Sequence, residues 1–266
     1  MLNLPLIDSH CHLDLAAFDH DRAQVLKDAA DHGIKGILIP GLDNKQFNKL
    51  LDLQTRISTP ELFIDIALGI HPYFMQAALQ EGSDKLRGDF CELAESYQHK
   101  IVAIGECGLD SVLMLDMPIQ ARILQMQIEV AKQLNKPLVL HHRQSHNQLI
   151  RLLKKTKFQG GGLIHAFSGS VELAKTYIDL GFYLGVGGTI TYPRAQKTRN
   201  ALASISLQHL LLETDAPDMP LNGFQGQRNS PVQLPRVADA LAQLKACTIQ
   251  EVATVTCRNY SLLFSR

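Results

Sequence analysis

The chain has 266 residues, of which 45% are hydrophobic and 20% are charged, proportions typical of a folded globular protein with a substantial core. Lysine plus arginine and aspartate plus glutamate both number 26, so the formal net charge is zero. This balance excludes the broad positive surface of an architectural DNA-binding protein, although an enzyme that contacts only a few phosphates remains compatible with it.

Short apolar runs alternate with longer segments of helical periodicity along the whole chain. The eight predicted strands are Leu4–His12, Gly33–Gly41, Phe63–His71, Ile101–Gly108, Pro137–His142, Gly161–Phe167, Phe182–Gly188 and Leu210–Asp215. The predicted helices are Asp21–His32, Lys45–Arg56, Ser83–Gln98, Pro118–Asn135, Gln144–Lys155, Val171–Leu180, Ala195–Ser204, Val232–Leu244 and Ile249–Phe264. Eight strand–helix units favour a closed parallel barrel over an open doubly wound sheet. We expect a single, slightly distorted TIM-type (β/α)8 barrel domain spanning residues 1–266.

The first predicted strand ends in Asp8-Ser9-His10-Cys11-His12. Side chains alternate between the two faces of a strand, so His10 and His12 are expected to point together into the barrel, with Asp8 one layer deeper. Two imidazoles on one face can hold a metal ion. The alternative is a pair of core histidines that are satisfied by hydrogen bonds.

Ligand-type residues also occur at the ends of four other predicted strands. Because barrel active sites form at the C-terminal ends of strands, five strands should bring four histidines and two carboxylates to one rim. Burying such polar side chains is costly unless they are paired or coordinated. The residues are His10, His12, Glu106, His141, His165 and Asp215.

Six ligands exceed the three protein ligands that usually hold one hydrolytic metal. They suit two divalent ions, about 3.5–4 Å apart, that share a bridging carboxylate. Glu106 is the expected bridge, with His10, His12 and Asp215 on one ion and His141 and His165 on the other. We predict that Asp215 also accepts a proton from the attacking water. The site would therefore use a metal-activated hydroxide.

Six short motifs occur in order along the chain: Asp8-Ser9-His10-Cys11-His12, Gly69-Ile70-His71-Pro72, Gly105-Glu106-Cys107-Gly108-Leu109-Asp110, His141-His142-Arg143, His165-Ala166-Phe167-Ser168-Gly169 and Glu213-Thr214-Asp215-Ala216-Pro217. Taken together, they resemble the TatD family of metal-dependent hydrolases, from about Ile7 to Phe264. The family has amidohydrolase-like barrels, and the resemblance implies a deoxyribonuclease that acts on DNA ends, of the 3′–5′ exonuclease type, with Mg²⁺ or Mn²⁺. It also implies the same six metal ligands.

The same resemblance implies that His71 and Arg143 lie near the substrate. A guanidinium there can hold a phosphate oxygen in bidentate fashion. The alternatives are a rim salt bridge for Arg143 and a turn-capping role for His71, which precedes Pro72. Leu113 and Met114, in the loop after Asp110, are expected to form an apolar lip of the site.

The leading hypothesis for function is phosphodiester hydrolysis by two divalent ions, with Glu106 and Asp215 as the catalytic carboxylates. Mg²⁺ or Mn²⁺ would support turnover, and Zn²⁺ would bind tightly on purification. The alternative keeps the metals and changes the substrate to a small amide, lactone or ester. A metal-storing or scaffolding protein would be expected to lack a ligand, and none of the six is missing.

The N-terminal segment has no basic region, and the longest uncharged stretch is too short for a membrane span. Five scattered cysteines without Cys-x-x-Cys spacing indicate reduced thiols. We therefore expect a cytoplasmic protein whose partner is a DNA end or a small phosphoester, with no membrane and no obligate protein partner. His142 and His146 are expected to be solvated at the start of a helix, or else to form a second polar patch.

Overall fold

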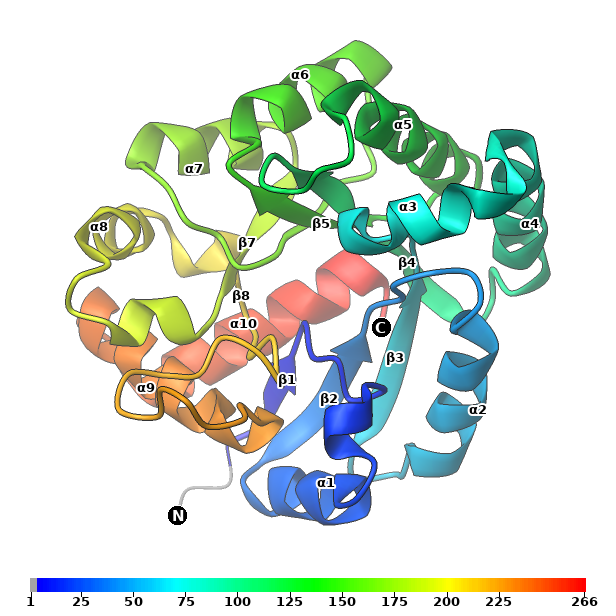
Figure 1. Cartoon of the computed structure of the whole chain (residues 1–266). Coiled ribbons are helices and arrows are strands. Elements are labelled where there is room, and N and C mark those ends of the chain that lie inside the picture. Colours follow the sequence, from blue (N-terminus) through cyan, green and yellow to red (C-terminus); the bar gives the residue numbers. More distant parts are fainter. Residues whose placement is uncertain (1–3) are drawn as a thin grey trace.

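The structure, a computed structural model, describes residues 4–266 and consists of eight parallel strands enclosed by helices (Figure 1). The strands are β1 (Leu6–Asp8), β2 (Ile34–Ile39), β3 (Phe63–Leu68), β4 (Ile101–Asp110), β5 (Leu138–Arg143), β6 (Gly162–Ile164), β7 (Phe182–Val186) and β8 (Leu210–Leu212). Each strand pairs in parallel with the next along the chain. A backbone hydrogen bond of 2.9 Å from Ser9 to Leu212 joins the first strand region to the last. The predicted (β/α)8 barrel is thereby confirmed.

Helices cover the outside of the barrel (Figure 1). The α-helices are α1 (Arg22–Asp31), α2 (Phe47–Ile57), α3 (Met75–Ala78), α4 (Ser83–Ser96), α5 (Met117–Gln133), α6 (His146–Thr156), α7 (Val171–Asp179), α8 (Gln196–Ser204), α9 (Leu234–Lys245) and α10 (Ile249–Phe264). Short 3-10 turns are η1 (Ala16–Phe18), η2 (Pro72–Phe74), η3 (Leu79–Glu81), η4 (Gly188–Thr191), η5 (Leu207–His209) and η6 (Pro231–Gln233). No helix within residues 4–266 is long and apolar enough to cross a membrane.

Alternation along the strands produces two separate hydrophobic cores. The larger core lies between the strands and the surrounding helices, where Ile37, Ile104 and Leu140 pack. The smaller core contains one residue from each of six strands, together with the α10 side chains Tyr260 and Phe264. Its strand members, which fill the inside of the barrel, are Leu38, Ala67, Ala103, Val139, Leu163 and Leu211.

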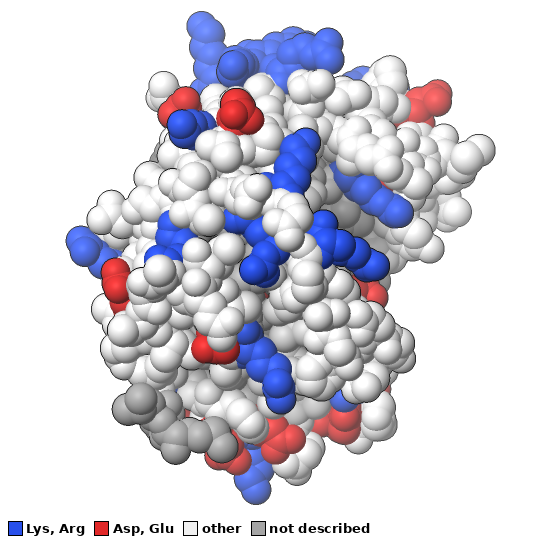
Figure 2. Space-filling model, turned by 90° about the vertical axis from the view of Figure 1, so that its left-hand side faces the viewer, with Lys and Arg blue, Asp and Glu red and all other residues white. Residues whose placement is uncertain are grey.

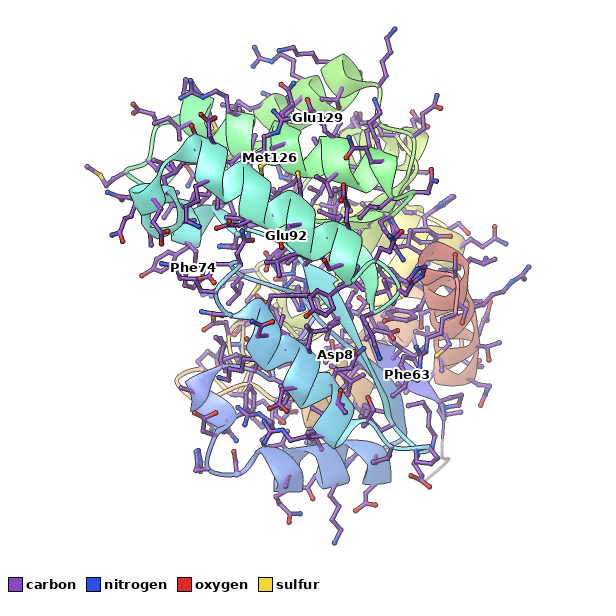
Figure 3. All side chains as sticks on the ribbon, turned by 90° about the vertical axis from the view of Figure 1, so that its right-hand side faces the viewer. Asp8, Phe63, Phe74, Glu92, Met126 and Glu129 are labelled. Carbon is purple, nitrogen blue, oxygen red and sulfur yellow. The ribbon has the colours of Figure 1, made fainter. Side chains whose placement is uncertain are left out.

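Helix α10 closes the N-terminal end of the barrel. The Tyr260 hydroxyl donates a 2.9 Å hydrogen bond to Asp65 of β3, which is buried. The Arg266 guanidinium pairs with the same carboxylate at 2.6 Å and lies 3.8 Å from the centre of the Phe63 ring. Phe63 begins β3, whereas Phe74 lies beyond its other end, so the two mark opposite ends of the barrel (Figure 3). The C-terminal ends of the strands are therefore at the end of the barrel that α10 leaves uncovered.

The predicted strand bounds were wrong at three places that matter for the site. The first strand ends at Asp8 rather than His12, the sixth at Ile164 rather than Phe167, and the eighth at Leu212 rather than Asp215. Beyond these points single backbone hydrogen bonds replace the ladders, such as Cys11 to Leu38 at 3.1 Å. The fourth strand is longer than predicted and continues to Asp110.

The contact between α10 and Asp65 should contribute measurably to stability. Tyr260→Phe removes one hydrogen bond to a buried carboxylate and should lower the free energy of unfolding by about 1–3 kcal/mol. Urea denaturation followed by circular dichroism measures the change. Tyr73→Phe is the matched control, because Tyr73 is 69% exposed. Equal midpoints for the two variants would contradict this role of the hydroxyl.

Candidate metal centre

The layer directly above the barrel core carries polar side chains. Val139 and Leu163 point inward, and because alternate residues share a face, His141 and His165 point inward two positions later. Glu213 follows the inward-pointing Leu211 in the same way. All three lie where the apolar core ends, at the mouth of the barrel.

Glu106 reaches this layer through an irregularity in β4. Glu106 follows the inward-facing Ala103 by three residues, so simple alternation along the strand would point it outward. The register between β4 and β5 shifts between Ile104 and Cys107, which turns Glu106 into the barrel. The neighbouring backbone approaches closely: a Cβ on Gly69 would lie 2.3 Å from the Gly105 carbonyl carbon. Only a glycine fits at position 69 without displacing the chain beneath Glu106.

His10 and His12 lie in the loop after β1, not on the strand, so their common direction does not come from strand alternation. The His10 amide bonds to Asp8 Oδ1 at 3.3 Å, and the His12 amide bonds to the Ala216 carbonyl at 2.8 Å. These bonds bring the two imidazoles together, with their Nε2 atoms 3.2 Å apart. The predicted pairing of the two histidines is therefore correct, although its predicted cause was wrong.

Asp215 lies beyond the end of β8 and is positioned by its neighbours. Its amide donates to the His10 carbonyl at 2.9 Å, and its φ of 57° places it in the left-handed region. The buried Asp8 carboxylate holds Thr214 through the backbone at 2.9 Å and through the hydroxyl at 2.6 Å. Asp8 thus fixes the two chain segments that carry His10 and Asp215, and it does not contact an imidazole directly.

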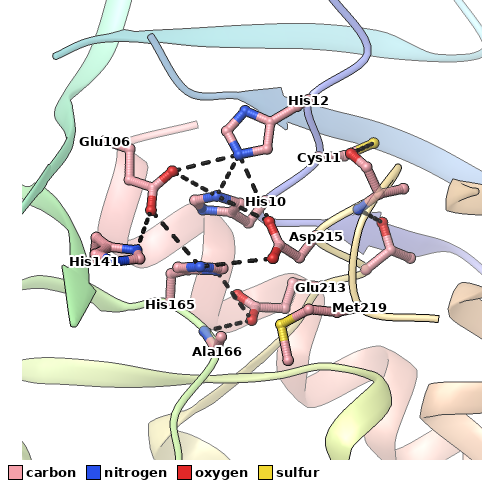
Figure 4. A network of polar contacts seen from close by, with 12 residues as sticks. His10, Cys11, His12, Glu106, His141, His165, Ala166, Glu213, Asp215 and Met219 are labelled. Carbon is pink, nitrogen blue, oxygen red and sulfur yellow. Dashed lines mark hydrogen bonds and ion pairs between the residues drawn. The ribbon is translucent and has the colours of Figure 1, made fainter. Parts of the chain in front are cut away.

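The Glu106 carboxylate contacts four histidines of the cluster (Figure 4). Its Oε2 atom is 3.1 Å from His10 Nε2 and 3.4 Å from His12 Nε2. Its Oε1 atom is 3.1 Å from His141 Nδ1 and 3.7 Å from His165 Nε2. Each carboxylate oxygen therefore faces a different pair of histidines.

Asp215 completes the side of the cluster that holds His10 and His12. Its Oδ1 atom is 3.6 Å from the Nε2 atoms of both histidines, and its Oδ2 atom is 3.9 Å from His165 Nε2 (Figure 4). The structure thus brings together all six residues that the sequence predicts as ligands. Their role as metal ligands stays a prediction.

The donor set fits divalent metal ions. Three groups have ligand atoms that lie within 4.8 Å of one another: His10 with Glu106 and His165, His10 with His12 and Asp215, and His71 with Glu106 and His141. Ligand atoms of a tetrahedral ion with bonds of about 2.1 Å are about 3.4 Å apart, close to the separations found here. Imidazole and carboxylate are also the donors that zinc and manganese accept.

The buried charges perturb one another. Burial by itself lowers the pKa of His12, but the hydrogen bond and charge of Glu106 and the charge of Asp215 raise this pKa to about 9. The pKa of His141 is shifted in the same way: burial lowers this pKa, and contacts with Asp110 and Glu106 raise it to about 9. Burial raises the pKa of Asp215 to about 8. Protons and metal ions must therefore compete for the same side chains.

His71 has the predicted turn-capping role and also faces the cluster. Its Nδ1 atom accepts a 3.1 Å hydrogen bond from the Tyr73 amide, at the start of η2. The ring hydrogen therefore resides on Nε2, which lies 3.5 Å from Glu106 Oε1. Burial lowers the pKa of His71 to about 3, so the ring is neutral at physiological pH. In this tautomer His71 offers a hydrogen-bond donor to the pocket and no free nitrogen lone pair.

The cluster forms the floor of a pocket of about 410 Å³. Arg143 lines this pocket and makes no ion pair within residues 4–266, so the predicted alternative of a rim salt bridge is not found. Leu113 lines it as predicted, but Met114 is 96% exposed and does not. The lining residues are His12, Leu15, Leu42, His71, Tyr73, Phe74, Glu106, Asp110, Leu113, His141, Arg143, His165, Asp215 and Asp218.

Two further carboxylates lie beside the ring nitrogens of His141 and His165 that face away from Glu106. Asp110 Oδ2 lies 3.5 Å from His141 Nε2, and Glu213 Oε1 lies 3.4 Å from His165 Nδ1. Carboxylates in this position orient ligand imidazoles and fix their tautomers. Asp110 was not among the predicted site residues. The signal for Asp110 was present, because it ends the Gly108-Leu109-Asp110 motif beside the predicted strand end.

His142 is buried, which contradicts the prediction that it is solvated. Its ring lies 4.1 Å from the ring of His146, whose Nδ1 is 2.9 Å from the Tyr177 hydroxyl. His142 follows His141 on β5 and therefore points outward, under α6 and α7, away from the pocket. The two histidines form the second polar patch that was the alternative prediction.

A TIM-type barrel with a cluster of histidines and carboxylates at the mouth defines the class: a metal-dependent hydrolase of the barrel type. Residues 7–265 match the family model described as TatD related DNase. This chain belongs to the TatD family.

Relatives within the family match over nearly their full length. The uncharacterized metal-dependent hydrolase YjjV of Escherichia coli is 40% identical over 262 residues, covering 97% of each chain. Its crystal structure superposes with a TM-score of 0.87, covering 98% of both chains. The putative deoxyribonuclease TATDN3 of Mus musculus is 30% identical over 274 residues, covering all of this chain and 90% of the relative.

Metal affinity should rise with pH. At neutral pH the raised pKa values keep protons on His12 and His141, and a bound ion must displace them. We expect Zn²⁺ or Mn²⁺ to bind metal-stripped protein more tightly at pH 8 than at pH 6 and to release protons. Calorimetry in buffers of different ionisation enthalpy counts these protons. A His12→Gln variant should release fewer, and affinity that does not change with pH would refute the competition.

Asp110 should act through His141. Asp110→Asn removes the charge beside His141 Nε2 and should weaken metal binding about 10–100-fold while the fold is retained. Equilibrium dialysis against a metal buffer measures the affinity. Asp116→Asn is the control, because Asp116 is an exposed carboxylate at the start of α5. Unchanged affinity in the Asp110 variant would show that His141 does not need this partner.

Proposed function

We propose that the protein is a divalent-metal-dependent deoxyribonuclease that hydrolyses phosphodiester bonds at DNA ends, of the 3′–5′ exonuclease type. The observation that carries the proposal is the position of Glu106, whose two oxygens face different pairs of histidines. A carboxylate in this arrangement suits two ions with one bridging ligand, the arrangement found in many phosphodiester-cleaving sites.

In this proposal each ion has its own protein ligands. His10, His12 and Asp215 would hold one, and His141 and His165 the other, with Glu106 shared. When bound, Mg²⁺ or Mn²⁺ supplies positive charge that polarises the phosphate and lowers the pKa of water; Zn²⁺ fits the same donors. The negative charge of the pocket favours the binding of cations, since four carboxylates and a single arginine line it.

The protein's own groups bind and orient the substrate. The unpaired Arg143 guanidinium can hold a phosphate oxygen, and His71 Nε2–H can donate to a second one. In this proposal Asp215, whose side chain is 14% exposed at the pocket floor, accepts the proton of the attacking water. The closed N-terminal end of the barrel keeps water from reaching the site from below.

The DNA substrate is also supported by the family and by the name of the mouse relative. A small amide, lactone or ester remains the second candidate, because Leu15, Leu42, Phe74 and Leu113 give the pocket an apolar side. Apolar lining is typical of sites for small ligands. The two candidates differ in whether the substrate extends beyond the pocket.

The first test is cleavage of end-labelled single- and double-stranded DNA by metal-stripped protein, with Mg²⁺, Mn²⁺ or Zn²⁺ added in turn. We expect progressive shortening from the 3′ end, dependent on metal. Glu106→Ala should lower the rate at least about 10³-fold, because both proposed ions lose a ligand.

Thermal unfolding of the Glu106→Ala variant shows whether the barrel is intact. Exposed Glu92 on α4 gives the matched control, and Glu92→Ala should keep full activity (Figure 3). No DNA cleavage with any of the metals, together with hydrolysis of a small ester, would replace the leading candidate with the second one.

A further inference from the structure

A second, smaller pocket lies beside the mouth of the barrel. It has a volume of about 260 Å³ and is lined by the loops that follow β7 and β8. Asp218 lines the metal-site pocket, and the next residue, Met219, lines the smaller one. The same loop therefore contributes to both pockets. Met219 and Glu213 lie on the same side of the polar cluster (Figure 4). The smaller pocket therefore adjoins the metal-site pocket at this loop.

The walls of this rim pocket are held firmly. The Tyr192 hydroxyl donates a 2.7 Å hydrogen bond to the Pro220 carbonyl, and the Asn222 amide donates to Thr191 Oγ1 at 2.9 Å. These two bonds join the β7 loop to the β8 loop. Asn229, which is buried, donates to the Met219 carbonyl at 3.2 Å. The pocket is therefore preformed.

Its lining has the chemistry of a nucleotide-binding platform. The Arg194 guanidinium lies 5.0 Å from the centre of the Tyr192 ring. Arg194 is exposed and makes no ion pair within residues 4–266, in contrast to Arg228, which pairs with Asp21 at 2.5 Å. Met219 is 38% exposed and adds an adaptable apolar contact. Arginine planes, aromatic rings and thioethers contact nucleobases, and an unpaired guanidinium contacts phosphate.

The charge distribution points to a polyanion. Residues 143–200 contain nine lysines and arginines but only Glu172 and Asp179 as acids, although the whole chain has 26 charges of each sign. This segment forms one continuous sector of the barrel, from the end of β5 to α8. Figure 2 shows the face over α7 to α9, where basic side chains cross the middle and acidic ones lie mainly toward the edges.

From these observations we infer that the rim pocket of Tyr192, Arg194 and Met219 binds the single-stranded DNA segment next to the scissile nucleotide. The inference rests on the proposed function and adds a specificity-determining site to it. Arg194 contacts a phosphate or stacks on a base outside the metal site, and it does not touch the reacting atoms. It therefore matters for a strand of several nucleotides and not for a minimal phosphodiester.

The test compares two substrates in Arg194→Ala, using the metal that supports wild-type turnover. For a single-stranded oligonucleotide of about ten nucleotides, KM should rise about ten-fold at unchanged kcat. For bis(p-nitrophenyl) phosphate, kcat/KM should not change. The salt dependence of log kcat/KM on the oligonucleotide should weaken by about 0.7, the contribution of one phosphate contact. Arg194→Lys should restore this salt dependence.

The matched control is Arg258→Ala, because Arg258 is exposed on α10 and unpaired within the described residues. It should leave both substrates unaffected. An active wild type with the same oligonucleotide KM in Arg194→Ala would overturn the rim site and leave the proposed function standing. A wild type that hydrolyses only bis(p-nitrophenyl) phosphate would overturn the DNA substrate, and the rim site with it.

Discussion

The buried carboxylate of Glu106 is the constraint on which the mouth of the barrel depends. It is 2% exposed and lies within 3.7 Å of nitrogen atoms from five histidines, His10, His12, His71, His141 and His165. A buried charge of this kind is stable only with compensating partners. Burial alone would raise the pKa of Glu106, but the surrounding imidazoles, together with a hydrogen bond from His10, hold it well below its usual value. The surrounding loops serve to keep the histidines in place.

The two ends of the barrel carry different kinds of side chain. At the N-terminal end, Tyr260 and Phe264 of α10 complete an apolar core, and the single buried carboxylate, Asp65, is fully paired. At the C-terminal end, the carboxylates and imidazoles have more hydrogen-bonding atoms than they can pair with one another. The first end stabilises the fold, and the second gathers the residues that are predicted to bind metal ions. The barrel interior separates them by one apolar layer.

A net charge of zero hides an uneven distribution. The sector from β5 to α8 is basic, whereas the pocket itself is lined by four carboxylates and one arginine. In the proposed function, bound cations reverse the sign of the pocket, and the basic sector then continues the same attraction for phosphate outside it. Overall charge alone says nothing of such local contrasts.

Much of the site was predictable because strand periodicity and barrel topology are simple rules. His141 lies in β5, and His165 directly follows β6, where its amide still bonds to the Leu140 carbonyl at 3.1 Å, so alternation directs both inward. The same rules failed for His10, His12 and Asp215, which lie beyond the strand ends and are oriented by hydrogen bonds between residues distant in sequence, such as Asp215 to the His10 carbonyl.

The sequence by itself determined the eight-fold order of strands and helices, the family and the identity of the six converging residues, because these depend on local periodicity and short motifs. Only the tertiary structure decided how Glu106 turns inward, since a register shift against β5 has no local signal. It also decided the tautomer of His71, the contact of Asp110 with His141 and the pairing of Tyr192 with Arg194. The contact of Asp110 with His141 depends on β4 and β5 becoming neighbours, whereas the other two contacts join residues two positions apart and depend on the local path of the chain.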